Sequence, residues 1–153
     1  RKPYRGAVPL TGGGGFFTHP IRAYFLPYGS GSTRSGNLGV GADFFFTPTL
    51  NGCTFAASDN GVAPTVAHSN YVDASTKIDQ PRIGQDLNGI FGTARPAVCL
   101  VKTDYKRPTT GSKDYRVTVV GFRSPAGWRF FYQQYRVKEG KAHRPLNTCV
   151  ELV

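Results

Sequence analysis

One cysteine and one histidine have the types and the spacing to do chemistry together. Cys53 follows Asn51-Gly52, and a glycine before a nucleophile lets the backbone turn sharply and lets a substrate approach. His68 lies fifteen positions after Cys53. A histidine within hydrogen-bond reach of a thiol can take its proton and leave a thiolate nucleophile near neutral pH. The two residues therefore predict covalent cysteine chemistry.

A hairpin must position the two side chains for that chemistry. Residues 50–57 and 64–72 read as strands around the turn 58–61, whose Asn-Gly step favours a hairpin because both residues tolerate positive φ. We expect this hairpin to place Cys53 and His68 on neighbouring strands. The alternative that the two side chains only fill space between strands stays open on spacing alone.

A third group is needed to fix the tautomer of the imidazole. Thr47, Asn70 and a backbone carbonyl are the candidates within reach of the predicted hairpin.

The same segment carries a family resemblance. The residues Leu50-Asn51-Gly52-Cys53-Thr54, followed by Val66-Ala67-His68, resemble the active-site signature of the bacterial toxin glutamine deamidases of the cytotoxic necrotizing factor type. The likeness is local, and it lies in the Gly-Cys-Thr step, the Cys-to-His interval and the valine two positions before the histidine. It implies Cys53 as the nucleophile and His68 as the general base.

The resemblance also bears on the third element. In a related lethal-factor branch of the family this element is a threonine six residues before the cysteine, which is Thr47 here. Asn70 is the alternative, by analogy of role with papain-type enzymes, in which an asparagine orients the histidine.

The implied activity is deamidation of a glutamine side chain in a target protein. The thiolate attacks the carboxamide, ammonia leaves, and water hydrolyses the thioester to glutamate. A primary amine in place of water would give transglutamination, and attack on a peptide bond would give proteolysis. The dyad alone does not distinguish these three outcomes.

The resemblance implies a virulence effector, secreted or translocated into a target cell as part of a larger protein. We expect its partner to be a protein substrate, such as a small GTPase or another host or competitor protein, and we count an inhibitory immunity protein among the partners. No cofactor and no metal are expected, because Cys53, Cys99 and Cys149 lack the paired spacing of a zinc site.

The pattern of elements predicts one α+β domain. We expect a mixed, mainly antiparallel β-sandwich with one or two flanking helices, as the toxin family also has. Residues 1–15 read as a basic and glycine-rich arm or linker, and residues 16–153 as a single catalytic domain. Residues 29–42 read as a surface loop. The strands are expected at 43–47, 50–57, 64–72, 97–105, 115–123, 128–137 and 147–153, and the main helix at 73–91, capped by Asp73 or Ser75 and closed by Gly92.

The charge supports a second hypothesis of another class. The chain has 19 Lys and Arg against 9 Asp and Glu, a formal net charge of +10. Basic residues gather at 1–5, 102–113 and 129–141, and the latter two clusters interleave with aromatic residues, which would suit a non-catalytic module that binds single-stranded nucleic acid. Nucleic acid is the weaker expectation, because the same aromatics are equally well explained as core. No apolar run reaches the roughly 18 residues of a membrane span.

The remaining cysteines and histidines receive structural roles. Cys99 and Cys149 lie among aliphatic residues and are expected to be buried. His19 and His143 have no obvious chemical partner and are expected to be structural or on the surface. Cys53 is accordingly predicted to react with iodoacetamide faster than Cys99 or Cys149.

Overall fold

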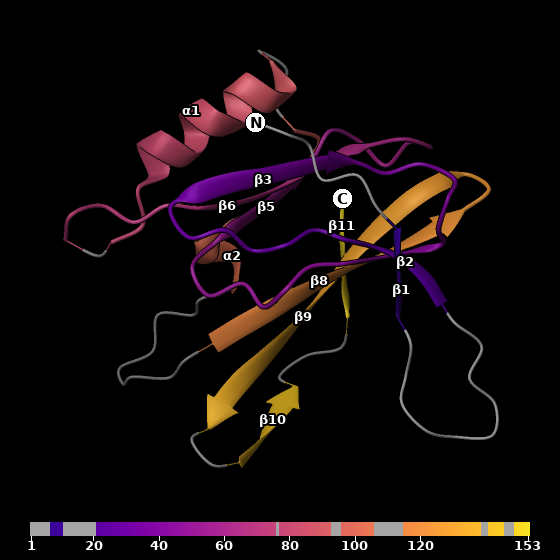
Figure 1. Ribbon diagram of the computed structural model, residues 1–153. Coiled ribbons are helices and arrows are strands. Elements are labelled where there is room, and N and C mark those ends of the chain that lie inside the picture. The colour runs from indigo at the N-terminus through magenta and orange to yellow at the C-terminus, as the bar shows by residue number, and fades with distance from the viewer. Residues whose placement is uncertain are drawn as a thin grey trace.

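Two β-sheets packed face to face make up the protein, as seen in the computed structural model (Figure 1). It describes residues 7–10, 21–75, 77–92, 96–105, 115–138, 141–145 and 149–153, with the backbone alone at 7–10, 137–138 and 141–145. The described strands are β1 (Ala7–Leu10), β2 (Ile21–Phe25), β3 (Ser32–Asn37), β4 (Phe44–Phe46), β5 (Thr54–Ala57), β6 (Thr65–Asn70), β7 (Val98–Leu100), β8 (Tyr115–Ser124), β9 (Gly127–Lys138), β10 (Lys141–Pro145) and β11 (Val150–Leu152), and the helices are α1 (Gln80–Phe91) and α2 (Lys102–Tyr105). The predicted class, a mixed and mainly antiparallel β-sandwich with flanking helices, is confirmed.

The large sheet has the order β1-β2-β4-β8-β9-β10, and β11 also pairs with β9. Its β2–β4 pair is parallel, and its other described pairs are antiparallel. The long hairpin β8–β9 is its centre, and the sequence predicted both strands and their turn. Gly127 opens β9 at φ 128°, where a Cβ would lie 2.2 Å from the carbonyl oxygen of Asn60. The turn therefore packs tightly on the loop between β5 and β6.

The small sheet has the order β3-β6-β5-β7 and is antiparallel throughout. The predicted hairpin is its centre: β5 and β6 pair through Thr54↔Ser69 and Phe55↔His68. The loop 58–64 that joins them is tightened where the Asp59 carboxylate accepts a hydrogen bond from the N–H of Gly61 at 2.6 Å.

The main core fills the space between the sheets. Trp128, Phe45, Phe55 and Phe130 are each 0% exposed, and the rings of Phe45, Phe55 and Phe130 contact one another at centroid distances of 5.4–5.9 Å. Aromatic burial of this size dominates the stability of such a core.

A second core lies on the other face of the small sheet, which α1 covers (Figure 1). Ile83 and Leu87 of the helix pack against Ala56 and Ala67 of the hairpin. The small alanine side chains leave room for the helix. The helix thus packs on the hairpin from the face of the small sheet that is opposite the main core.

Four local expectations differ from the structure. The helix begins at Gln80 with Asp79 as its cap, because Pro81 fits only the first turn and because Asp73 instead closes the loop before it. Residues 32–37 form β3 rather than a loop. Residues 97–105 give a three-residue strand and then α2. Within the segment assigned to an arm, β1 pairs with β2.

Candidate active site

A turn at Gly52 presents Cys53. Gly52 has φ 96°, and a Cβ on it would lie 2.8 Å from Cδ1 of Ile78, so neither the backbone conformation nor the space admits a side chain. The predicted role of the glycine, a sharp turn before the cysteine, is in place. The backbone N–H of Asn51 donates a hydrogen bond to the thiol of Cys53.

Cys53 directly precedes β5, His68 lies on the neighbouring strand β6, and the two residues share a face. Phe55 is the cross-strand partner of His68, and directly opposed residues share a face. Cys53 lies two residues before Phe55, so side-chain alternation turns it to that same face, toward the large sheet. His68 is therefore a diagonal neighbour of Cys53. The positions that the sequence predicted to come together do so at the level of the backbone.

The imidazole and the thiol are not hydrogen-bonded to each other. Neither ring nitrogen of His68 has a hydrogen-bond partner among the described residues, although the side chain is 1% exposed. A buried polar atom without a partner is costly and rare in folded proteins. Catalytic hydrogen bonds are often long or unformed before a substrate binds, so the unpaired imidazole is compatible with a role in catalysis.

Burial sets the protonation of both groups. Burial raises the pKa of the Cys53 thiol, and the hydrogen bond from the backbone of Asn51 opposes this only in part. Burial lowers the pKa of His68 to about 4. At neutral pH the resting site thus holds a neutral thiol and a neutral imidazole, the form in which the imidazole can accept a proton.

A pocket of about 480 Å³ opens beside the cysteine. The residues that line it carry two carboxamides, two hydroxyls, one thiol and one guanidinium, with no carboxylate: Tyr28, Pro48, Thr49, Asn51, Cys53, Asn70 and Arg116. Thr49 is held by a 2.5 Å hydrogen bond with the hydroxyl of Tyr135. The lining is neutral except for the arginine, and it offers both donors and acceptors.

Tyr28 connects this pocket with His68. Its ring lies edge-on to the imidazole at a centroid distance of 6.1 Å, and its hydroxyl accepts a 2.8 Å hydrogen bond from the amide of Asn70. Sequence reasoning missed Tyr28, which lies forty positions before His68. The β3–β6 pairing brings Ser32 opposite Asn70, and no local pattern in the sequence indicates that pairing.

The two candidates for the third element do not contact the imidazole. The hydroxyl of Thr47 is buried on the backbone of Val119, accepting from its N–H at 3.2 Å. Asn70 donates to Tyr28 instead. The structure thus places Thr47 just after β4, against β8, and Asn70 at the pocket, and neither orients His68 in this state.

Tyr105 is a second residue that sequence reasoning missed. Its phenol oxygen accepts from the N–H of Gly52 and donates to the carbonyl of Cys53, each at 2.8 Å. Tyr105 lies more than fifty positions away in a segment expected to be strand, so its approach to Cys53 follows only from the packing of the two sheets.

The other cysteines do not share these surroundings. Cys99 and Cys149 are free and exposed, which corrects the expectation that they are buried. Cys99 lies on the outer face of the edge strand β7, and Cys149 just precedes β11. Unspecific alkylation is therefore expected to reach these two thiols before the buried Cys53, the reverse of the order expected from the sequence.

The remaining chemical candidates give no second site in the described part of the chain. His19 lies outside the described residues, and the side chain of His143 does too. Among the residues described, no group of three His, Cys, Asp or Glu could hold a metal ion. No described helix is long and apolar enough to cross a membrane.

Most aromatics of the basic segments have structural partners where they are described. Trp128 and Phe130 are 0% exposed in the core, and Tyr132 packs against it. Phe131 lies half-buried beneath the guanidinium of Arg129 at 5.2 Å from its centroid. Residues 106–114, which carry much of the other basic segment, lie outside the described residues.

Models of known protein families give no match to this chain, and a search of curated proteins finds none either.

Proposed function

We propose that this chain is a toxin-type effector domain that deamidates glutamine side chains of a target protein. One observation carries the proposal: Cys53, held in a turn that only glycine suits, lines an open pocket and is the diagonal neighbour of a buried histidine whose nitrogens have no partner among the described residues. The resemblance of the Gly-Cys-Thr segment to the toxin deamidases supports the choice of reaction.

The steps balance with these two residues and water. His68 takes the thiol proton, and the sulfur of Cys53 forms a bond to the carboxamide carbon of glutamine. The tetrahedral oxyanion then collapses, the C–N bond breaks, and the imidazolium gives its proton to the departing ammonia. Water, deprotonated by His68, attacks the thioester. The C–S bond breaks, glutamate is released, and the thiolate regains a proton from the imidazolium.

The lining of the pocket supports a carboxamide as substrate. A carboxamide has both donors and acceptors, and Asn51, Asn70 and Thr49 offer the complementary groups. A pocket without a carboxylate also leaves the developing oxyanion free of like-charge repulsion, while the guanidinium of Arg116 adds a favourable positive charge.

His68 must gain access to the substrate for this reaction. Tyr28 lies against the imidazole and lines the pocket, and its own side chain is half exposed. We place the required movement at Tyr28: when a substrate side chain enters, displacement of the phenol ring would open His68 to the thiol and to the reacting carbon.

The same resemblance supports a place outside the producing cell, with the domain secreted or translocated into a target cell. A protein substrate, and an immunity protein that blocks the site, are the partners consistent with that use. The net charge of +10 favours an acidic protein surface as the target.

Two other reactions of the same thiol remain as alternatives: transglutamination, if an amine replaces water, and proteolysis, if a peptide bond is attacked. The non-catalytic alternative, a module that binds single-stranded nucleic acid, receives less support because Trp128 and Phe130 are not available for stacking.

Peptide mapping of proteins from cells exposed to the domain tests the proposal. Defined glutamines should be converted to glutamate by the wild type and by Cys99→Ser, but not by Cys53→Ser, since a serine hydroxyl is a far weaker nucleophile. Amine-linked glutamines would instead indicate a transglutaminase, and new chain termini a protease. Conversion that persists in Cys53→Ser would refute the proposed nucleophile.

A further inference from the structure

Tyr105 holds the backbone on both sides of the nucleophile's turn. Its side chain is 0% exposed at the end of α2. The phenol oxygen accepts from the N–H of Gly52 and donates to the carbonyl of Cys53, so one hydroxyl closes a ring around the Gly52–Cys53 peptide. Both hydrogen bonds are 2.8 Å long, a normal length for well-formed bonds.

Tyr105 is itself fixed from two directions. Its backbone carbonyl accepts a hydrogen bond from the side-chain amide of Gln134, on the central strand β9. The start of α2 is closed by Asp104, whose carboxylate accepts from the N–H of Val101 at 2.7 Å. Tyr105 therefore connects strand β9 of the large sheet, through Gln134, with the turn at Gly52 and Cys53.

The turn needs such a support. Gly52 lies at positive φ, a conformation that a flexible glycine leaves easily when nothing holds it. The N–H of Asn51 is bonded to the thiol of Cys53. The donor precedes Gly52 and the sulfur follows it, so a rotation about the Gly52 backbone would separate the two.

We propose that Tyr105 is a positioning residue for Cys53: its hydroxyl fixes the Gly52–Cys53 peptide and thereby the place of the thiol at the pocket. The hydroxyl also occupies the N–H of Gly52. That amide is thereby withdrawn from the substrate and is not available to donate to the oxyanion. This inference rests on the proposed function for its catalytic meaning, but its structural content can be tested without any substrate.

Amide exchange in the unmodified protein gives the first test. The N–H of Gly52 lies outside every described strand, yet the bond to Tyr105 should protect it. In Tyr105→Phe, which keeps the buried ring and removes only the oxygen, exchange at Gly52 should be roughly tenfold faster or more, as expected for the loss of one buried hydrogen bond. Exchange of Gly52 in the wild type at the rate of an open loop would overturn the proposal.

The pH dependence of Cys53 alkylation gives the second test. Its midpoint reports the pKa of the thiol rather than its accessibility. In Tyr105→Phe the midpoint should move to higher pH by roughly half a unit or more, because the sulfur loses the Asn51 N–H. An unchanged midpoint in a folded Tyr105→Phe variant would mean that the residue is structural only.

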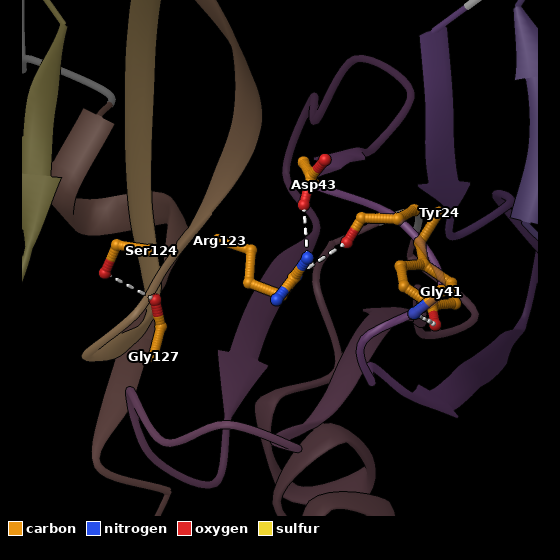
Figure 2. A network of polar contacts seen from close by, with 7 residues as sticks. Tyr24, Gly41, Asp43, Arg123, Ser124 and Gly127 are labelled. Atoms are coloured by element: carbon orange, nitrogen blue, oxygen red, sulfur yellow. Dashed lines mark hydrogen bonds and ion pairs between the residues drawn. The ribbon is translucent and has the colours of Figure 1, made fainter.

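Tyr24→Phe is the matched control. The hydroxyl of Tyr24 also accepts a glycine N–H, that of Gly41, at 3.3 Å, and Figure 2 shows this bond together with the ion pair of Arg123 and Asp43. Its removal should leave the Cys53 midpoint and the Gly52 exchange rate unchanged, and an equal shift in the control would overturn the assignment to Tyr105. If Cys53→Ser kept deamidase activity, the proposed function would fail, while the exchange and alkylation results for Tyr105 would still stand.

Discussion

His68 is a polar and titratable side chain that lies buried without hydrogen-bond partners among the described residues. The imidazole is 1% exposed, its two nitrogens have no partner among the described residues, and its pKa is about 4. An apolar side chain of similar size would suit this position better for stability alone. Proteins retain such unfavourable groups chiefly where function requires them.

His68→Leu should therefore separate stability from activity. We expect the free energy of unfolding of the variant at pH 7 to exceed that of the wild type by about 1 kcal/mol, because two unsatisfied polar atoms are removed from the interior. Deamidase activity should be lost. Urea unfolding at pH 7 measures the first effect, and destabilisation by several kcal/mol would show that the imidazole has a structural role instead.

The pH dependence of stability follows from the same residue. The pKa of His68 is lower in the folded state, about 4, than the ordinary 6.5, so the unfolded chain binds the proton more tightly. Above about pH 6.5 proton binding by the unfolded chain should not affect stability. As the pH falls from 6.5 to 4, the free energy of unfolding of the wild type should decrease by roughly 3 kcal/mol. In His68→Leu this part of the slope should vanish. An identical slope in both proteins between pH 6.5 and 4 would contradict the assignment.

At the scale of the elements, the two strands of the hairpin and the segment before β3 decide what His68 meets. β6 lies between β3 and β5, so the imidazole has Tyr28 near one side and the Cys53 turn near the other. The desolvation that lowers its pKa depends on these neighbours. Cys53 is buried, whereas the side chain of Tyr28 is half exposed, so Tyr28 is the neighbour that stands between the imidazole and the solvent.

Tyr28→Ala should raise the pKa of His68 from about 4 toward its ordinary value, because water would reach the ring. Titration of the imidazole by NMR measures the change. Asn70→Ala is the matched variant: it removes the hydrogen bond to the Tyr28 hydroxyl but leaves the aromatic ring, so it should shift the pKa less. No shift in Tyr28→Ala would exclude Tyr28 as the cover of the imidazole.

Local sequence patterns predicted part of this arrangement and missed the rest for a physical reason. The β5–β6 and β8–β9 hairpins were predictable, because Asn60-Gly61 and Gly127 are local turn signals. The first turn was predicted too tight, since the connection is the loop 58–64 and Gly61 does not adopt the positive φ expected of it. The start of α1 was misplaced because Asp73 and Asp79 are equally good capping residues by type. Tyr28 and Tyr105 reach the site only through contacts between distant strands, which no local pattern records.

At the scale of the whole molecule, the two sheets are joined at both ends of the β5–β6 hairpin. Tyr105 and Gln134 connect them near Cys53. At the other end, the N–H of Trp128 donates to the carbonyl of Gly61 at 3.1 Å, and the turn at Gly127 lies directly on the same loop. The position of the cysteine turn thus depends on how the large sheet is packed.

Gly127→Ala should weaken this joint. The residue has φ 128°, and a Cβ would lie 2.2 Å from the carbonyl oxygen of Asn60, so backbone strain alone should lower the free energy of unfolding by roughly 1–3 kcal/mol. Gly84→Ala, within α1 and with nothing near the added methyl, should instead raise it by about 0.5–1 kcal/mol. Thermal or urea unfolding compares the two, and equal effects would show that the contact at Gly127 does not hold the two sheets together.

We expect the net charge of the molecule to influence which partner binds, and not the chemical reaction in the pocket. The net charge is +10, yet the lining of the pocket carries a single charged side chain, that of Arg116. A neutral thiol and a neutral imidazole therefore meet the substrate in a site whose chemistry is set by burial and hydrogen bonds.

The order in which the three cysteines react with two electrophiles tests the central claim most directly. Methyl methanethiosulfonate, a small thiol reagent without a carboxamide for the pocket to bind, should label the exposed Cys99 and Cys149 before the buried Cys53. A glutamine-mimicking chloroketone peptide should reverse this order and label Cys53 first, and His68→Leu should abolish the reversal. Labelling of Cys99 and Cys149 ahead of Cys53 by both reagents would contradict the proposal that Cys53 attacks a glutamine held in this pocket.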